Sequence, residues 1–365
     1  MIVRPQYYDD FECIADRCSF TCCRDWRIAV DDDTYSKWSR EYRAKVSDGA
    51  IILNKDGKCP FLDEKGLCRI VLKEGEEAIS QTCHTFPREN HIFETRTEQT
   101  LAMGCPEAVD SLWKLQRWEV VGAEKYDTDT TEGLMFYLRD RILALMGDEQ
   151  VAIETALKTA FYIALDYYDY QVENNEPDRE YVDKLFDKSN VEEIVKAING
   201  VQRNYSDHIY EQNELLMDIM ENYRRKGIYS DIIEPIATAA GLYEQDEYEE
   251  EFLEGRKTFE NEWNKLQNEI RLLMQEEIFS SLYLPEGDIY TIVLKLQWLG
   301  ITYAALKQMM FLVWKKNGCL EYTIRRKLVC VLIRMTGYSE GDIEEYLENS
   351  FEEIIWDWGY MGLIV

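Results

Sequence analysis

The sequence predicts a mainly α-helical protein, in which a Cys-rich N-terminal region of short elements packs on a C-terminal multi-helix domain. Three observations predict this fold class. The chain of 365 residues has 19 Gly and 7 Pro but 24 Tyr, 13 Phe and 9 Trp, which is typical of a packed chain rather than of a linker. Eight of the ten cysteines precede residue 106, and periodic apolar segments fill most of the later sequence.

The first region, residues 1–118, is interrupted by turn-forming sequences at 54–57, 63–66 and 86–87. Residues 26–30 and 91–95 are candidates for short strands. Charge also separates this region from the rest, because 17 basic and 21 acidic residues precede position 118, against 24 and 49 from there on. We therefore expect loops and short elements here, followed by an acidic helical domain over residues 119–365.

The acidic domain opens with predicted helices at 131–146 and from Ile153 to Tyr168, where apolar residues recur at three- and four-residue steps. Ser189 and Glu192 have the spacing of a capping box, and Gly200 stands where a C-terminal glycine cap would. These residues predict a bounded helix over 189–200.

The later helices are predicted from longer periodic runs. A near-heptad spacing from Phe252 to Leu273 predicts one long helix after the acidic run that begins at Glu244. The most apolar stretch, Thr291 to Trp314, contains two lysines and two glutamines, which favours a core helix over a membrane span. The remaining helices are predicted at 205–226, 288–314, 319–335 and 340–349.

The dense N-terminal cysteines are candidate metal ligands. The first thirteen residues lack the apolar core of a signal peptide, so we expect a cytoplasmic protein with reduced thiols. Thiolates are soft ligands that select zinc, copper(I) or iron–sulfur centres. Buried structural thiols are the alternative, and we assign that role to Cys319 and Cys330. The candidate ligands are Cys13, Cys18, Cys22, Cys23, Cys59, Cys68, Cys83 and Cys105.

The ligand set within these eight cysteines stays open. Because adjacent side chains usually diverge, a single ion is expected to use either Cys22 or Cys23. His84 and His91 are either further ligands or polar loop residues, whereas His208 has no partner suggested by spacing. The pattern disfavours a radical S-adenosylmethionine triad, since its third cysteine position is occupied by Asp25.

Composition and motifs exclude several other functions. A formal charge of -29 disfavours nucleic-acid binding. No GxSxG, Walker, HExxH or GxGxxG pattern occurs in a suitable context. Two aromatic groups, one around Tyr162 to Tyr170 and one from Trp298 to Trp314, fit a core better than a channel for a cationic side chain. The acidic residues 244–254 attract a basic segment or form a solvated helix face.

Several cysteine motifs together carry a resemblance to a known family. They are Phe11-Glu-Cys13-Ile, Cys18-x3-Cys22-Cys23-x2-Trp26-x-Ile28, Asp33-Thr34-Tyr35, Cys59-Pro-Phe-Leu62, Gly66-Leu-Cys68-x-Ile70, Thr82-Cys83-x2-Phe86-Pro-Arg88 and Cys105-Pro-Glu-Ala108. With these motifs the chain resembles the flagellin lysine-N-methylase family, within a wider cysteine-cluster group described as zinc- or iron-chelating. The motifs cover roughly the first third of the chain.

The resemblance implies a protein lysine N-methyltransferase that uses S-adenosylmethionine and acts on flagellin, with an N-terminal [4Fe-4S] cluster or zinc held by the cysteines. The net charge and the interrupted apolar stretch separately lead us to expect no nucleic-acid partner and no membrane. The main rival is a non-catalytic metal or cluster protein that interacts through its acidic helical surface. An oxidoreductase that uses the cluster for electron transfer ranks last. The sequence identifies neither the catalytic residues nor the oligomeric state.

Overall fold

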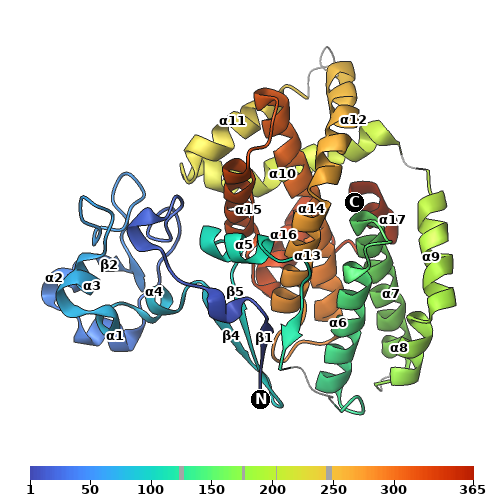
Figure 1. Ribbon diagram of the computed structural model, residues 1–365, viewed down its shortest axis with the longest axis horizontal. Coiled ribbons are helices and arrows are strands. Elements are labelled where there is room, and N and C mark those ends of the chain that lie inside the picture. The colour runs from blue at the N-terminus through green and yellow to red at the C-terminus, as the bar shows by residue number, and fades with distance from the viewer. Residues whose placement is uncertain (123–126, 175–176, 203, 244–248) are drawn as a thin grey trace.

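The computed structural model of the protein describes residues 1–122, 127–174, 177–202, 204–243 and 249–365. A small N-terminal lobe stands beside a larger helical body, and a narrow sheet with helix α5 lies between them (Figure 1). The described part of the chain is mainly α-helical, which confirms the predicted fold class.

The N-terminal lobe consists of short elements around a core of its own. Its buried residues include Ile28, Trp38, Phe61 and Ile70, and four of the cysteines pack against or within this cluster. Asp31 caps the first helix, because its side chain accepts a hydrogen bond from the Thr34 amide. Before the lobe come η1 (Tyr8–Asp10), which contacts β5, and η2 (Ala15–Arg17). The elements of the lobe are α1 (Asp32–Lys37), α2 (Arg40–Arg43), β2 (Val46–Ser47), β3 (Ala50–Ile51), α3 (Arg69–Glu74), η3 (Glu76–Ala78) and α4 (Gln81–Thr85).

A four-stranded sheet connects the lobe to the body. Its strands follow the order β4 (Arg88–Ile92), β5 (Thr97–Leu101), β1 (Ile2–Pro5) and β6 (Val120–Val121). Strands β4 and β5 are antiparallel, with Glu89 opposite Thr100 and His91 opposite Glu98, whereas β1 runs parallel to β5. Helix α5 (Pro106–Trp113) follows the sheet with proline in its first turn, where no amide donor is needed.

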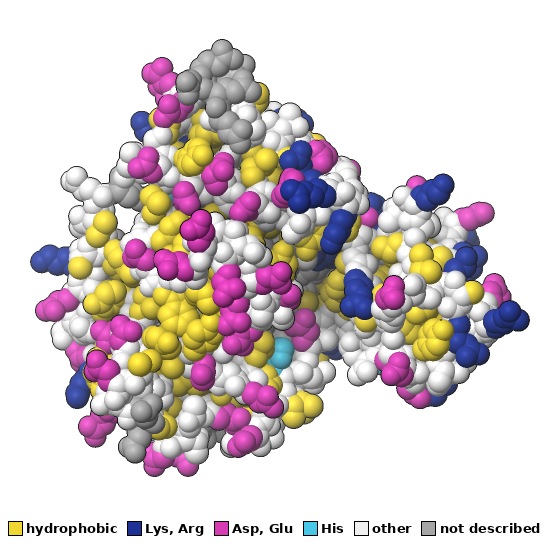
Figure 2. All heavy atoms as spheres, turned by 180° about the vertical axis from the view of Figure 1, so that it is seen from behind, with side chains coloured by type: hydrophobic (Ala, Val, Ile, Leu, Met, Phe, Trp, Pro, Cys, Tyr) yellow, Lys and Arg dark blue, Asp and Glu magenta, His cyan; other side chains and the backbone are white. Residues whose placement is uncertain are grey.

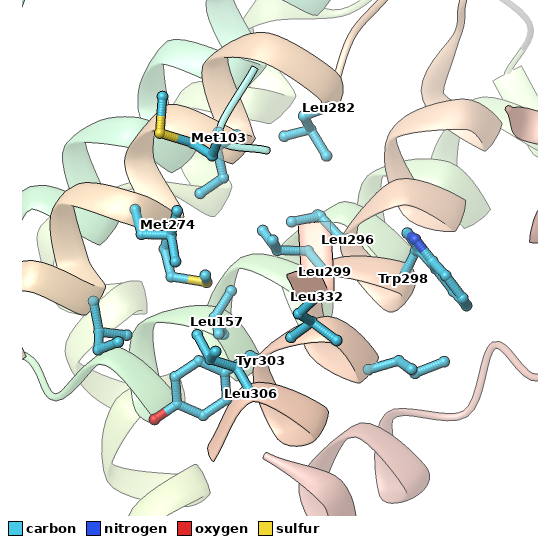
Figure 3. Packing of buried hydrophobic residues seen from close by; sticks show 14 of the residues in the cluster. Met103, Leu157, Met274, Leu282, Leu296, Trp298, Leu299, Tyr303, Leu306 and Leu332 are labelled. Atoms are coloured by element: carbon cyan, nitrogen blue, oxygen red, sulfur yellow. The ribbon is translucent and has the colours of Figure 1, made fainter. Parts of the chain in front are cut away.

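The helical body packs around one long central helix, α14 (Ile289–Asn317). In Figure 3, Leu296, Leu299 and Leu306 from this helix lie close to Leu332 and Leu157 of neighbouring helices. By length and composition α14 is apolar enough to cross a membrane, but 94% of its most apolar window is buried inside the protein, as predicted for a core helix. The other helices are α6 (Thr131–Gly147), α7 (Ile153–Asn174), α8 (Arg179–Leu185), α9 (Lys188–Gly200), α10 (Tyr205–Arg225), α11 (Ser230–Gly241), α12 (Glu249–Lys265), α13 (Gln267–Ser281), α15 (Tyr322–Thr336), α16 (Glu340–Phe351) and α17 (Trp358–Ile364).

The predicted helix boundaries hold for most of the body, and three local predictions are wrong. The run from 252 to 273 forms two helices, because the backbone leaves the helical path at Leu266. Helix α9 is capped by Asp187 rather than by Ser189, and Gly200 is still helical. Part of the acidic run, residues 244–248, lies outside the described residues.

The predicted strands are only partly right. Residues 26–30 form no strand, although Ala29 makes an isolated bridge to Ala50. Strand β4 begins three residues before the predicted strand at 91–95, and the sheet partners β1 and β5 were not anticipated.

The chain contains two hydrophobic clusters, and their boundary does not coincide with the predicted division at residue 118. One cluster holds residues between Ile28 and Ile70, whereas the other joins the first twenty residues and the sheet to the helical body. The lobe with its own core is therefore an insertion between β1 and β4, and the division at residue 118 remains a prediction.

Candidate functional site

The structure sorts the candidate cysteines into two neighbouring sets. In the first set, the Cys59 thiol lies within electrostatic range of Cys23, Cys68 and Cys83. Cys83 in turn is influenced by Cys23 and Cys68, and Cys22 by Cys23 and Cys83. Residues from three separate loops and from α4 thus meet in the N-terminal lobe.

The second set lies against the helical body. Cys18 interacts electrostatically with Cys13, and Cys105 interacts with Cys18. Cys330 of α15 is buried behind these two thiols, whereas Cys319 is exposed between α14 and α15. The predicted buried role is therefore confirmed for Cys330 and wrong for Cys319, because the chain turns away from the core after Gly318.

Tight turns bring the loops of the first set together. The Asn54 side chain accepts hydrogen bonds from the amides of Asp56 and Lys58, and the Asp63 side chain accepts them from Lys65 and Leu67. Gly57 and Gly66 have positive φ angles, which the sharp reversals require. These turns stand directly before Cys59 and Cys68 in the chain.

The prediction that the side chains of Cys22 and Cys23 diverge is wrong. The Cys22 thiol donates a hydrogen bond to the sulfur of Cys23, which lowers the pKa of Cys23 to about 7 and raises that of Cys22 well above its ordinary value. Burial raises the pKa of Cys59 to about 12 and that of Cys83 to about 11. Buried thiols of this kind keep their protons unless a cation takes the protons' place.

The cysteine side chains are near one another but not in a finished coordination geometry. Among the described residues, no three or more His, Cys, Asp or Glu side chains are arranged to hold a metal ion. His84 is exposed in α4, His91 lies on β4, and the buried His208 ring hydrogen-bonds to the Leu363 carbonyl oxygen. The first set brings together thiols, which are soft ligands.

A groove of about 1020 Å³ lies between the sheet and helices α6 and α13. Cationic, acidic and amide side chains line it, together with the indole of Trp118. At its inner wall, Arg139 donates hydrogen bonds to both oxygens of Glu98, at 2.6 and 2.7 Å, and Arg96 pairs with the same carboxylate. The volume of the groove is at the upper end of the range for ligand pockets in proteins. Sequence reasoning missed this groove, since its residues come from five separate segments of the chain.

The two aromatic groups, for which a core was preferred over a channel, belong mainly to the core. Tyr167, Trp298 and Tyr303 are buried, whereas Tyr162 is exposed. The Tyr303 hydroxyl donates to Glu154, and Trp263 donates to Tyr303 at 3.1 Å. The preferred core interpretation is confirmed for these buried side chains.

Charge is distributed unevenly over the surface. Figure 2 shows acidic side chains spread over the helical body, with Lys and Arg gathered on the smaller lobe and along its border with the body. Arg334 of α15 stands at this border and donates hydrogen bonds to the carbonyl oxygens of Gly104 and Phe20.

Fold and site together define a helical protein that carries a separate cysteine-clustered lobe. Residues 139–364 match the family model of the FliB lysine N-methylase C-terminal domain. This match covers more than half of the chain, from α6 to α17. The chain therefore belongs to the FliB lysine N-methylase family, as its cysteine motifs predict.

Individual relatives agree with this assignment. The chain is 30% identical over 128 residues to the flagellar biosynthetic protein FliU of Salmonella muenchen, an alignment that covers 30% of this chain and 76% of FliU. It is equally similar to the lysine-N-methylases of Salmonella choleraesuis and Salmonella typhimurium, over 32% of the length of each. The alignment thus spans about a third of these two enzymes. No solved structure matches the chain.

Proposed function

We propose that the protein is an S-adenosylmethionine-dependent protein lysine N-methyltransferase that acts on flagellin in the cytoplasm. The match of α6 to α17 to the FliB lysine N-methylase domain carries the proposal. Two relatives bear the name lysine-N-methylase, and a third is named as a flagellar biosynthetic protein.

Methyl transfer to lysine makes defined chemical demands. The ε-ammonium must lose a proton, because it has no lone pair, and the amine must approach the methyl carbon in line with the breaking bond to sulfur. A sulfonium donor supplies an activated methyl group when it is bound. The protein's own part is to hold both partners, exclude water and accept the proton.

The groove between the sheet and α13 is the proposed position for the methyl donor. Arg117 lines it and suits the donor's carboxylate, while Asp148 and Glu149 suit its amino group or ribose hydroxyls. Arg271 shapes the wall, since its guanidinium donates hydrogen bonds to the carbonyl oxygens of Asp148 and Val151. Trp118 offers an indole near the base of the groove. These residues match the mixed charge of S-adenosylmethionine better than that of a purely anionic nucleotide.

The cysteine lobe is proposed to bind a [4Fe-4S] cluster, with zinc as the alternative. Four thiols of the first set, those of Cys23, Cys59, Cys68 and Cys83, suit either centre in number and softness. Cys13, Cys18 and Cys105 form a smaller set close to α15. Because polar methyl transfer involves no redox step, the centre would stabilise the lobe and the surface that it presents.

The direct test is lysine methylation of flagellin. Flagellin expressed with and without this chain, purified and digested, would be analysed by mass spectrometry for lysines heavier by one or more methyl groups. Methylation that depends on both the chain and S-adenosylmethionine supports the proposal. Unmodified flagellin together with a metal-loaded, folded chain favours the non-catalytic interaction protein.

A further inference from the structure

The groove between the sheet and α13 has one face of each of two helices in its walls. On α6, Leu143 and Gly147 line it and stand four residues apart. On α13, Leu272, Gln275 and Phe279 line it at steps of three and four residues. Residues at these spacings share one side of a helix. Side chains on these two faces therefore meet a ligand that enters the groove.

The Gln275 carboxamide is a buried polar group without a partner. The side chain is 7% exposed, lines the groove and makes no hydrogen bond to any residue that the structure describes. The amides of Gln212 and Gln308, which are also buried, donate hydrogen bonds at 2.7 and 3.0 Å. The amide of Gln297 has no partner in the described chain either, but both of its polar atoms are enclosed by the core. Gln275 differs because its amide opens on the groove.

An unpartnered amide in this position points to a ligand. Buried polar groups in folded proteins are nearly always hydrogen-bonded, and leaving one without a partner costs free energy. A carboxamide carries an acceptor oxygen next to a donor nitrogen. The ligand that satisfies Gln275 completely therefore has a donor beside an acceptor.

Gly147 leaves the space that the amide occupies. A Cβ atom added at Gly147 would lie 2.9 Å from Nε2 of Gln275 and 3.8 Å from its Cδ. The φ angle of this glycine is not positive, so its backbone does not require glycine. Alanine is the better helix former, and Gly147 lies within α6. Space for the Gln275 amide is thus the physical reason for a glycine here.

Apolar side chains share the two helix faces with Gln275. Leu143, Leu272 and Phe279 line the groove and are buried. Arg117 and Asp148, whose charges suit other parts of the methyl donor, belong to neither helix. Apolar walls with one polar group suit a flat ring that has hydrogen-bonding groups along its edge.

Adenine is the part of the methyl donor with this chemistry. Its 6-amino group donates and the neighbouring ring nitrogen accepts, so one glutamine amide pairs with both at once. The donor's carboxylate only accepts and its ammonium only donates, so either group would satisfy half of the amide.

We propose that Gln275 recognises the adenine ring of the methyl donor, and that Gly147 leaves room for the amide to meet the edge of the ring. This assignment rests on the proposed function and makes Gln275 a specificity-determining residue of the donor site. Oε1 of Gln275 accepts from the 6-amino group, and Nε2 donates to the adjacent ring nitrogen.

The test is a thermodynamic cycle between one side chain and one group of the ligand. Isothermal titration calorimetry on the whole chain measures Kd for S-adenosylhomocysteine and for its analogue without the 6-amino group. In the wild-type protein, loss of this group should weaken binding about 10-fold. Gln275→Leu should weaken binding of S-adenosylhomocysteine on the order of 10- to 100-fold. In this variant, loss of the amino group should change Kd by less than about 2-fold, because its partner is gone. Gln202→Leu, at an exposed glutamine, is the control and should behave as the wild-type protein.

Gly147→Ala tests the space beside the amide. The added methyl group should displace the Gln275 amide and weaken binding of S-adenosylhomocysteine on the order of 10-fold. Gly341→Ala is the matched control, because Gly341 lies in α16 with no atom near its Cβ position. Tm should stay equal or rise in both Gln275→Leu and Gly147→Ala. The first change removes an unpartnered buried amide, and the second introduces a better helix former.

The possible outcomes lead to different conclusions. An equal effect of the 6-amino group in the wild-type and Gln275→Leu proteins overturns the assignment, and so does a lowered Tm in Gln275→Leu, since the amide would then be satisfied within the fold. Lysine methylation by the wild-type protein would in either case leave the proposed function standing. A wild-type protein that binds no S-adenosylhomocysteine and methylates no lysine ends both. Loss of the amino-group effect in Gln275→Leu, at an undiminished Tm, establishes Gln275 as the residue that recognises adenine.

Discussion

The guanidinium carbon of Arg334 lies 4.1 Å from the ring centroid of Phe20, and the same side chain donates a hydrogen bond to the Phe20 carbonyl oxygen at 3.3 Å. Its Nε atom donates to the Gly104 carbonyl oxygen at 2.9 Å. One side chain of α15 thus holds both the loop before Cys22 and the turn before Cys105. Its charge also favours the thiolate forms of these cysteines.

Replacement of Arg334 should loosen the contact between the lobe and the body. Arg334→Gln removes the charge and most of the hydrogen bonds, and we expect a loss of about 2 kcal/mol in the free energy of unfolding. Limited proteolysis should then cut near Phe20 earlier than in the wild-type protein. Arg225→Gln, in an exposed pair with Glu221, is the control and should change neither property by more than about 0.5 kcal/mol. Equal cleavage of wild-type and Arg334→Gln proteins would show that other contacts hold the lobe.

Removal of two thiols from the first cysteine set should release the proposed metal. Cys22→Ser combined with Cys59→Ser replaces one hydrogen-bonded and one buried thiol. After anaerobic purification we expect a lower iron or zinc content and a lower Tm, because metal binding stabilises the folded lobe. The control Cys319→Ser changes an exposed thiol outside both sets. Unchanged metal content and Tm in the double variant would remove the metal centre from the proposal.

Local periodicity predicts most of the helical body because helices are stabilised by neighbours three and four residues away. Helices α6, α10 and α14 follow their apolar patterns closely. The break at Leu266 is invisible to the same pattern, since the heptad spacing continues through it. The sheet cannot be predicted from local periodicity because its strands are far apart in the sequence. For example, Ile2 of β1 pairs with Thr97 of β5, more than ninety residues away.

The candidate sites, like the fold, have features that the local sequence predicts and features that depend on long-range packing. The density of cysteines predicts candidate metal ligands in the N-terminal region. It does not predict that the thiols form two sets, or that Cys330 lies behind one of these sets. The hydrogen bond from Thr100 to Glu276 is likewise not predictable from sequence, because it joins β5 to α13 across 176 residues. Long-range packing decides both arrangements.

Acid should weaken the protein through Glu154. Lys307 and the Tyr303 hydroxyl hold the pKa of this carboxyl at about 2, below its ordinary value of 4.5, against the opposing effect of burial. A lowered pKa in the folded state means that stability is present above about pH 4.5 and is lost as the pH falls toward 2. Glu154→Gln should therefore cost about 3 kcal/mol at pH 7 and much less at pH 3, measured by urea unfolding. A penalty that stays constant between these pH values would contradict the linkage; Glu262→Gln at the surface is the control.

Glu277 should have the opposite effect on stability. Its pKa is raised from 4.5 to about 8 in the folded protein, mainly by burial and by Glu276. The folded state therefore binds more protons than the unfolded state between these pH values, and stability falls as the pH rises through them. Glu277→Gln should leave Tm nearly unchanged at pH 4.5 and should stabilise the protein by about 2 kcal/mol at pH 9. Glu348→Gln, which removes an exposed carboxylate of α16, should show no such dependence on pH. If Glu277→Gln instead destabilised the protein at pH 9, the carboxylate would be satisfied within the fold and its pKa would not be raised.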